Sequence, residues 1–126
     1  MILVFGGAYQ GKLDYVMERF DLGEADIYRC NEKNSEKPDG KRVIYELDKW
    51  ILAKLIEKTY NEEDVNAFIR NLNEEIVICN DISCGIVPME PIQRAWREAV
   101  GRAMATLSKR GDEVIRLYCA IATKLK

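Results

Sequence analysis

The feature that most constrains this chain is its N-terminus, where an apolar run leads directly into a glycine-rich stretch. Residues 2–5 (I-L-V-F) are apolar without interruption, which is typical of a parallel strand buried on both faces. The next eight residues are G-G-A-Y-Q-G-K-L, and we predict a helix over residues 12–20. A buried strand, a glycine turn and a helix in this order predict an α/β fold whose first strand lies inside the protein.

Strand and helix patterns alternate along the rest of the chain. We predict further strands at residues 25–30, 43–47, 76–79 and 113–121. We predict further helices that begin at Asp48, Asn61 and Pro91, with Asp48 as the N-cap of the first. The alternation predicts an α/β sandwich with a mostly parallel, five-stranded sheet, and the length of 126 residues favours one domain over residues 1–126.

The glycine-rich stretch matches the pattern G-x-x-x-x-G-K of a phosphate-binding loop. Glycines let backbone N–H groups curl around phosphate oxygens, the helix N-terminus favours an anion, and Lys12 can reach the β- and γ-phosphates. An ordinary turn that happens to contain a lysine is the alternative. The motif assigns nucleotide binding to Gly6, Gly7, Ala8, Tyr9, Gln10, Gly11, Lys12 and Leu13.

The residue after Lys12 departs from this pattern. It is normally Ser or Thr, whose hydroxyl binds the Mg²⁺ that bridges the β- and γ-phosphates, and Leu13 cannot do so. Phosphate binding can survive through the backbone amides and Lys12, whereas a role for Mg²⁺ stays open and we assign no metal ligand. Glu46, at the end of the third predicted strand, stands where an additional carboxylate serving Mg²⁺ is expected; the alternative is a residue that faces solvent.

The composition excludes several catalytic classes, because the chain contains no histidine. A Ser-His-Asp or Cys-His unit, a histidine metal site and a histidine phospho- or nucleotidyl-enzyme are therefore ruled out. The net charge is −2, which argues against a dedicated nucleic-acid-binding protein. Residues 94–126 carry +5, which indicates either a solvated helix face and a basic tail or an attraction for a phosphorylated ligand or an acidic neighbouring subunit.

The four cysteines show no C-x-x-C spacing, and Cys79 and Cys84 make a poor zinc site without histidine. The apolar run at residues 1–5 is too short for a signal peptide or a membrane span. We therefore expect a cytoplasmic protein with reduced thiols and no membrane partner.

The C-terminal half carries a more specific pattern. Its elements are Gly85-Ile86-Val87-Pro88, Trp96-Arg97, Gly101-Arg102, Gly111-Asp112-Glu113-Val114 and the closing stretch from Ala120 to Lys126. Together with the opening M-I-L-V-x-G-G-A-x-x-G-K, they cover about half of the chain. This sequence resembles the adenosylcobinamide kinase / adenosylcobinamide-phosphate guanylyltransferase family. The resemblance implies a P-loop NTPase-like three-layer sandwich.

The family resemblance also implies an activity. Members use ATP or GTP to phosphorylate the aminopropanol hydroxyl of adenosylcobinamide, and then transfer GMP to that phosphate through a guanylylated histidine, in cobalamin biosynthesis. They assemble as trimers with sites near subunit interfaces, which implies a homo-oligomer here. Carried over residue by residue, the resemblance assigns catalytic roles to Lys12, Glu46 and Asp81, with Asp81 at the position of a family glutamate.

The departures from the family are as informative. The region that carries the guanylylated histidine is reduced to the loop at residues 31–40, and Lys49 and Trp50 stand near a threonine-rich segment of the family. Two hypotheses follow. The chain is an adenosylcobinamide kinase without guanylyltransferase activity, or it is a non-catalytic module derived from that family that binds nucleotide or another subunit.

Overall fold

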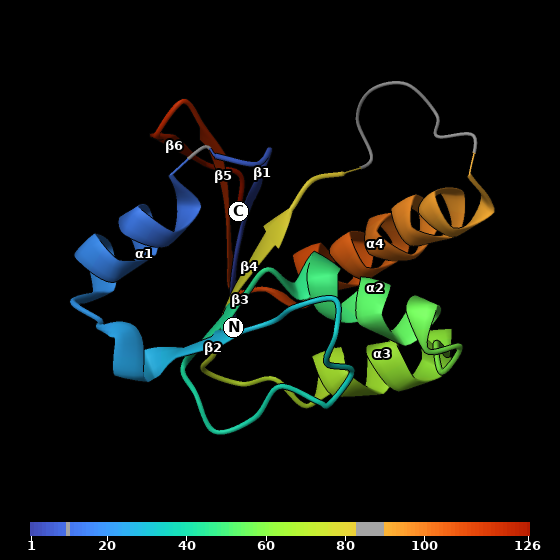
Figure 1. The fold of residues 1–126 in the computed structure, drawn as a ribbon. Helices are drawn as coiled ribbons and strands as arrows, with labels where there is room; N and C mark the ends of the chain where they lie inside the picture. The colour runs from blue at the N-terminus through green and yellow to red at the C-terminus, as the bar shows by residue number, and fades with distance from the viewer. Residues whose placement is uncertain (10, 83–89) are drawn as a thin grey trace.

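The computed structural model describes residues 1–9, 11–82 and 90–126, and it shows one sheet with helices on both faces (Figure 1). The strands are β1 (Ile2–Gly6), β2 (Ile27–Arg29), β3 (Val43–Tyr45), β4 (Ile76–Asn80), β5 (Glu113–Tyr118) and β6 (Ile121–Lys124). The helices are α1 (Lys12–Phe20), α2 (Leu47–Ile56), α3 (Glu62–Arg70) and α4 (Pro91–Arg110), with a short 3₁₀ turn at Glu24–Asp26. The predicted α/β sandwich is confirmed.

The strand order in the sheet is β2-β3-β4-β1-β5-β6. All neighbouring pairs from β2 to β5 are parallel, and β1 lies in the centre with Leu3 opposite Val77 of β4 and Val114 of β5. Parallel strands present their carboxyl ends at one edge of a sheet, and ligands of open α/β folds bind outside that edge. The segments that follow β1, β3 and β4 therefore meet at one place.

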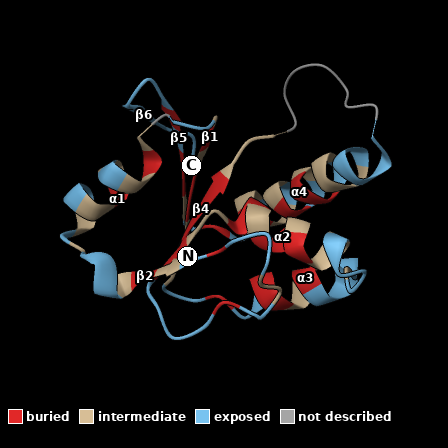
Figure 2. Ribbon diagram, viewed as in Figure 1, coloured by how far each residue is buried: buried red, intermediate tan, exposed pale blue. Residues whose placement is uncertain are grey.

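Two apolar cores hold the helices against the sheet, because successive strand residues point to opposite faces. Leu3 and Val77 belong to the core under α2, α3 and α4, whereas Val4 and Ile78 belong to the core under α1. In Figure 2 the buried residues run along the sheet and along the helix faces that cover it. This three-layer arrangement explains why the strand residues are apolar without interruption.

The C-terminal strand differs from the prediction, so the sheet has six strands instead of five. The segment predicted as one strand over residues 113–121 turns at Cys119 and Ala120, and β6 then pairs antiparallel with β5. Both turn residues have positive φ, 49° and 63°, as a tight hairpin of this kind requires. Glycine and asparagine normally mark such turns, and their absence is why the sequence does not predict the hairpin.

The helix starts test the predicted caps. Asn61 is an N-cap, since its side chain accepts hydrogen bonds from the N–H groups of Glu63 and Asp64. The prediction for Asp48 is wrong: α2 begins at Leu47, and Asp48 lies inside its first turn with a buried carboxylate. That carboxylate accepts hydrogen bonds from the backbone N–H and the side-chain amide of Asn80 in β4. Among the described residues, no helix is long and apolar enough to cross a membrane.

Candidate functional site

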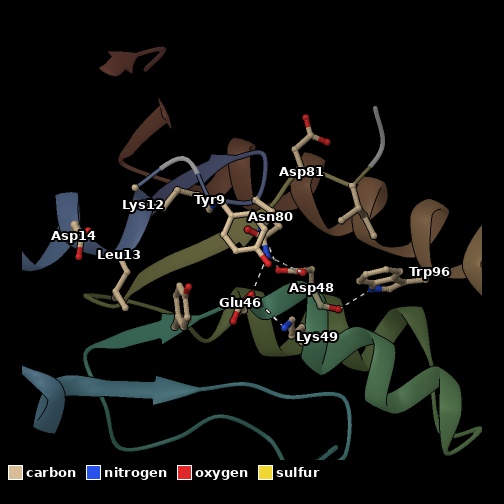
Figure 3. A pocket seen from close by; sticks show the side chains of 14 residues that line it. Tyr9, Lys12, Leu13, Asp14, Glu46, Asp48, Lys49, Asn80, Asp81 and Trp96 are labelled. Carbon is tan, nitrogen blue, oxygen red and sulfur yellow. Dashed lines mark hydrogen bonds and ion pairs between the residues drawn. The ribbon is translucent and has the colours of Figure 1, made fainter. Parts of the chain in front are cut away.

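A cavity of about 620 Å³ opens where the segments after β1, β3 and β4 meet (Figure 3). One wall is the glycine-rich loop with the first turn of α1. The other wall is formed by the start of α2, the end of β4 and Trp96 of α4. The lining residues are Ala8, Tyr9, Gly11, Lys12, Leu13, Asp14, Tyr45, Glu46, Asp48, Lys49, Asn80, Asp81, Ile82 and Trp96.

The loop wall depends on two glycines with positive φ. Gly6 has φ 156°, and a Cβ atom there would overlap the carbonyl oxygen of Leu117 in β5. Gly11 has φ 83° and is the N-cap of α1, so the chain turns sharply into the helix at this point. Both conformations are easy for glycine and strained for other residues. The glycines therefore fix the path of the loop that brings Lys12 to the cavity.

Lys12 is buried, with an exposed fraction of 5%. Its Nζ donates a hydrogen bond to the carbonyl oxygen of Gly7 at 2.6 Å, so the side chain folds back over the loop. Burial lowers the pKa of Lys12, and the nearby Asp48, Cys79 and Glu46 oppose that shift. A cation in a partly dry site interacts more strongly with an anion than it would in water. This lysine is suited to hold phosphate oxygens.

The opposite wall carries two carboxylates joined by one amide. Glu46 is the N-cap residue of α2 and has φ 61°, an uncommon conformation for a residue with a side chain. The Nδ2 of Asn80 donates hydrogen bonds to Oε2 of Glu46 at 3.1 Å and to Oδ2 of Asp48 at 3.2 Å. The Nζ of Lys49 lies 3.5 Å from the same oxygen of Glu46. Asn80 thus holds both carboxylates at the cavity.

Asp48 is the functional candidate that the sequence reasoning missed. It is 1% exposed, and its Oδ1 also accepts a hydrogen bond from the backbone N–H of Asn80 at 3.0 Å. Burial raises the pKa of Asp48, and the hydrogen bonds from Asn80 act in the opposite direction. The indole N–H of Trp96 donates to the backbone oxygen of Asp48 at 2.7 Å. In the sequence, an aspartate at the start of an amphipathic helix is the signal that could have marked Asp48 as a site residue. The same position is typical of a helix N-cap, and this is how we interpret it from the sequence alone.

The structure brings the three predicted catalytic residues together. Lys12, Glu46 and Asp81 all line the cavity, and the N–H of Asp81 donates to the carbonyl oxygen of Gly6 at 2.7 Å. Leu13 lines the cavity too, while its side chain packs against the core under α1. The predicted site residue Gln10 lies outside the described residues.

The remaining predicted binding residues follow the loop. Ala8, Tyr9 and Gly11 line the cavity, and Gly6 and Gly7 form the path that leads to it. Tyr9 is fully exposed at the loop and has φ 61°. The motif at residues 85–88 and Cys84 lie outside the described residues.

The residues around the cavity suit Mg²⁺ only as a companion of a phosphate ligand. No group of three or more carboxylate or cysteine side chains converges among the residues that the structure describes. Mg²⁺ is usually held by one or two carboxylates together with waters and substrate phosphates. Glu46 and Asp81 could supply such carboxylates, whereas Leu13 offers no oxygen.

Comparison with known proteins identifies one family. The model of the family described as cobinamide kinase / cobinamide phosphate guanyltransferase matches residues 17–125. The match begins within α1 and extends to the residue after β6, so it includes Glu46, Asp48, Asn80 and Asp81. The glycine-rich loop precedes the matched range. The prediction that this loop binds phosphate therefore rests on its sequence pattern and its geometry, and not on the family match. A search of curated proteins finds no match.

Proposed function

The chain belongs to the cobinamide kinase / cobinamide phosphate guanyltransferase family, and we propose that it retains the kinase half of this chemistry. In this proposal a nucleoside triphosphate, ATP or GTP, binds in the cavity. Its terminal phosphoryl group passes to a hydroxyl of adenosylcobinamide or a related alcohol. The observation that carries the proposal is the meeting of Lys12 with Glu46 and Asp81 in one cavity at the carboxyl edge of a parallel sheet.

Positioning and charge account for most of the catalysis in phosphoryl transfer. In our proposal the N–H groups of the loop and the ammonium of Lys12 hold the phosphate oxygens. Asn80 fixes one oxygen of Glu46, which leaves the other to accept the proton of the acceptor hydroxyl. The bond between the γ-phosphorus and the bridging oxygen breaks as the acceptor oxygen bonds to that phosphorus. Mg²⁺, when bound with the nucleotide, neutralises phosphate charge.

Guanylyl transfer by the route of the family is not part of the proposal. The resemblance implies that this step passes through a guanylylated histidine, and the chain has none. Residues 30–42 connect β2 to β3, at the position where the resemblance implies a longer region, and this supports the proposal. That loop packs against α2, since the indole N–H of Trp50 donates to the carbonyl oxygen of Ser35 at 3.1 Å.

The proposal is tested by nucleotide titration of the wild type and of Lys12→Met. Methionine keeps the buried apolar stem and removes the charge, so we expect ATP and GTP binding to weaken about a hundredfold. Thermal unfolding of the variant checks that the fold persists, and Lys109→Met is the control at an exposed lysine of α4. Equal affinity of the wild type and Lys12→Met would contradict the proposal.

Leu13 supports a second candidate, a module that binds nucleotide without transferring phosphate. Leu13→Ser restores the hydroxyl that usually binds Mg²⁺ in this motif. If only this ligand limits the enzyme, the variant transfers phosphate faster and binds nucleotide more tightly with Mg²⁺. If neither protein transfers phosphate and Mg²⁺ leaves the affinity unchanged, the module is the better description. Assembly with further copies of the chain stays a prediction from the resemblance.

A further inference from the structure

The charge around the cavity poses a problem for a phosphate ligand. The described lining contains four carboxylates, whereas its positive side chains are Lys12 and Lys49. A nucleoside triphosphate carries several negative charges, which the carboxylates repel. Because Leu13 provides no metal-binding oxygen on the loop wall, positive charge on the other wall matters more than it does in a loop with serine or threonine there.

Lys49 is placed to supply that charge. It lies in the first turn of α2, on the wall that faces the glycine-rich loop, and Figure 3 shows its ammonium beside Glu46. The distance from its Nζ to Oε2 of Glu46 is 3.5 Å, which is longer than a close charged hydrogen bond. Its side chain is 43% exposed, in contrast to the buried Lys12. The ammonium can therefore leave Glu46 for a ligand.

The stability of α2 does not explain a lysine at this position. A cation in the first turn of a helix opposes the helix dipole, which favours anions there. The Lys49 side chain is 43% exposed and that of Glu46 is 20% exposed, and an ion pair at 3.5 Å that solvent reaches in this way contributes little to stability. Glu46 also keeps a second partner, since Asn80 donates to the same oxygen. When Lys49 moves, Glu46 therefore stays in place.

We propose that Lys49 is a second phosphate-binding residue, which contacts the terminal phosphate of a nucleotide whose inner phosphates lie at the glycine-rich loop and Lys12. The inference rests on the proposed function, because it requires a nucleotide in this cavity. The phosphate chain then spans the two walls, and both of its ends meet a lysine. A lysine suits this task as a compact point charge on a flexible stem. Affinity should consequently depend on the number of phosphates.

The test is calorimetric titration of Lys49→Gln with ATP, ADP and AMP, in the presence of a chelator that removes Mg²⁺. We expect the variant to bind ATP about tenfold more weakly than the wild type, and AMP within about twofold. Lys49→Arg keeps the charge and should recover most of the ATP affinity. Lys54→Gln is the matched control, because Lys54 lies on the same helix and its ammonium sits 5.1 Å from the ring of Trp50, away from the cavity lining.

The outcomes separate the inference from the function on which it rests. If Lys49→Gln binds ATP as tightly as the wild type while Lys12→Met does not, the inference is wrong and the proposed function stands. If the affinities for ATP and AMP fall equally, Lys49 does not contact the terminal phosphate and the inference is also overturned. If the wild type binds none of the three nucleotides, either with the chelator or with Mg²⁺, both fail. Thermal unfolding of each variant excludes loss of the fold as the cause.

Discussion

The two walls of the cavity are built in different ways. The loop wall comes from residues 6–9 and 11–13 of one stretch of sequence, and its shape depends on Gly6 and Gly11. The acidic wall joins residues that lie 34 positions apart, Glu46 at the start of α2 and Asn80 at the end of β4. The loop wall is therefore built from one segment, whose path is set by φ at the two glycines and by the approach of β5 to Gly6, whereas the acidic wall exists only once the sheet and α2 have packed. The cavity needs both.

The loop wall is broken most strongly by Gly6→Ala. The new Cβ would overlap the carbonyl oxygen of Leu117, a backbone atom held within β5, and φ 156° is unfavourable for alanine. We expect a loss of about 3 kcal/mol in the free energy of unfolding, measured by urea denaturation. Gly101→Ala is the control, because nothing lies within 4 Å of its Cβ position in α4 and alanine favours a helix. A Gly6→Ala protein as stable as the wild type would contradict the close approach of the two backbones.

The acidic wall is broken by Asn80→Ala. The substitution removes the Nδ2 donor from Glu46 and Asp48 and leaves two carboxylates without a bridge. We expect a loss of about 2 kcal/mol in unfolding free energy, and a lower kcat for phosphoryl transfer with little change in nucleotide affinity. Asn66→Ala removes an amide that bonds Thr106 at 3.4 Å, away from the cavity, and serves as the control. Equal losses of stability in the two variants would refute the bridging role of Asn80.

The smallest effect is the pH dependence that Asp48 gives to the acidic wall. Burial raises its pKa above the ordinary 3.8, so the fold prefers the protonated form. The stability that protonated Asp48 contributes is complete below its pKa in the unfolded chain. It is lost as the pH rises through its pKa in the folded protein. We therefore expect the wild type to lose stability relative to Asp48→Asn as the pH rises from 3.8. The measurement is the free energy of unfolding of both proteins, from urea denaturation at a series of pH values. Curves that run parallel across the series would contradict the raised pKa of Asp48.

Much of the fold can be predicted from the sequence. The apolar strands and amphipathic helices are recognised from local patterns, and the predictions at residues 2–5, 43–47 and 76–79 found β1, β3 and β4. The final hairpin was missed because Cys119 and Ala120 adopt positive φ without the usual turn residues. There the pairing of β5 with β6 determines the backbone, and residue preference does not.

The site likewise has one part that a local sequence pattern predicts and one part that only the folded arrangement creates. The glycine pattern is contiguous, so it predicts the loop and Lys12 without knowledge of the fold. Asp48 fits a helix cap when only its own segment is considered. Its partner Asn80 follows 32 residues later, in strand β4. No local pattern pairs them. The sheet register pairs Tyr45, the last residue of β3, with Ile78, so β4 extends two residues past β3 and Asn80 lies beside Asp48 at the start of α2.

The most direct test of the central claim is a transfer assay with GTP or ATP labelled at either the α- or the γ-phosphate. The wild type is incubated with adenosylcobinamide and Mg²⁺, and label is followed in the corrinoid and in the protein. We predict that label from the γ-phosphate reaches the corrinoid, and that label from the α-phosphate reaches neither the corrinoid nor the protein. Transfer of α-label, or no transfer of γ-label by the wild type, would contradict a kinase that lacks guanylyl transfer.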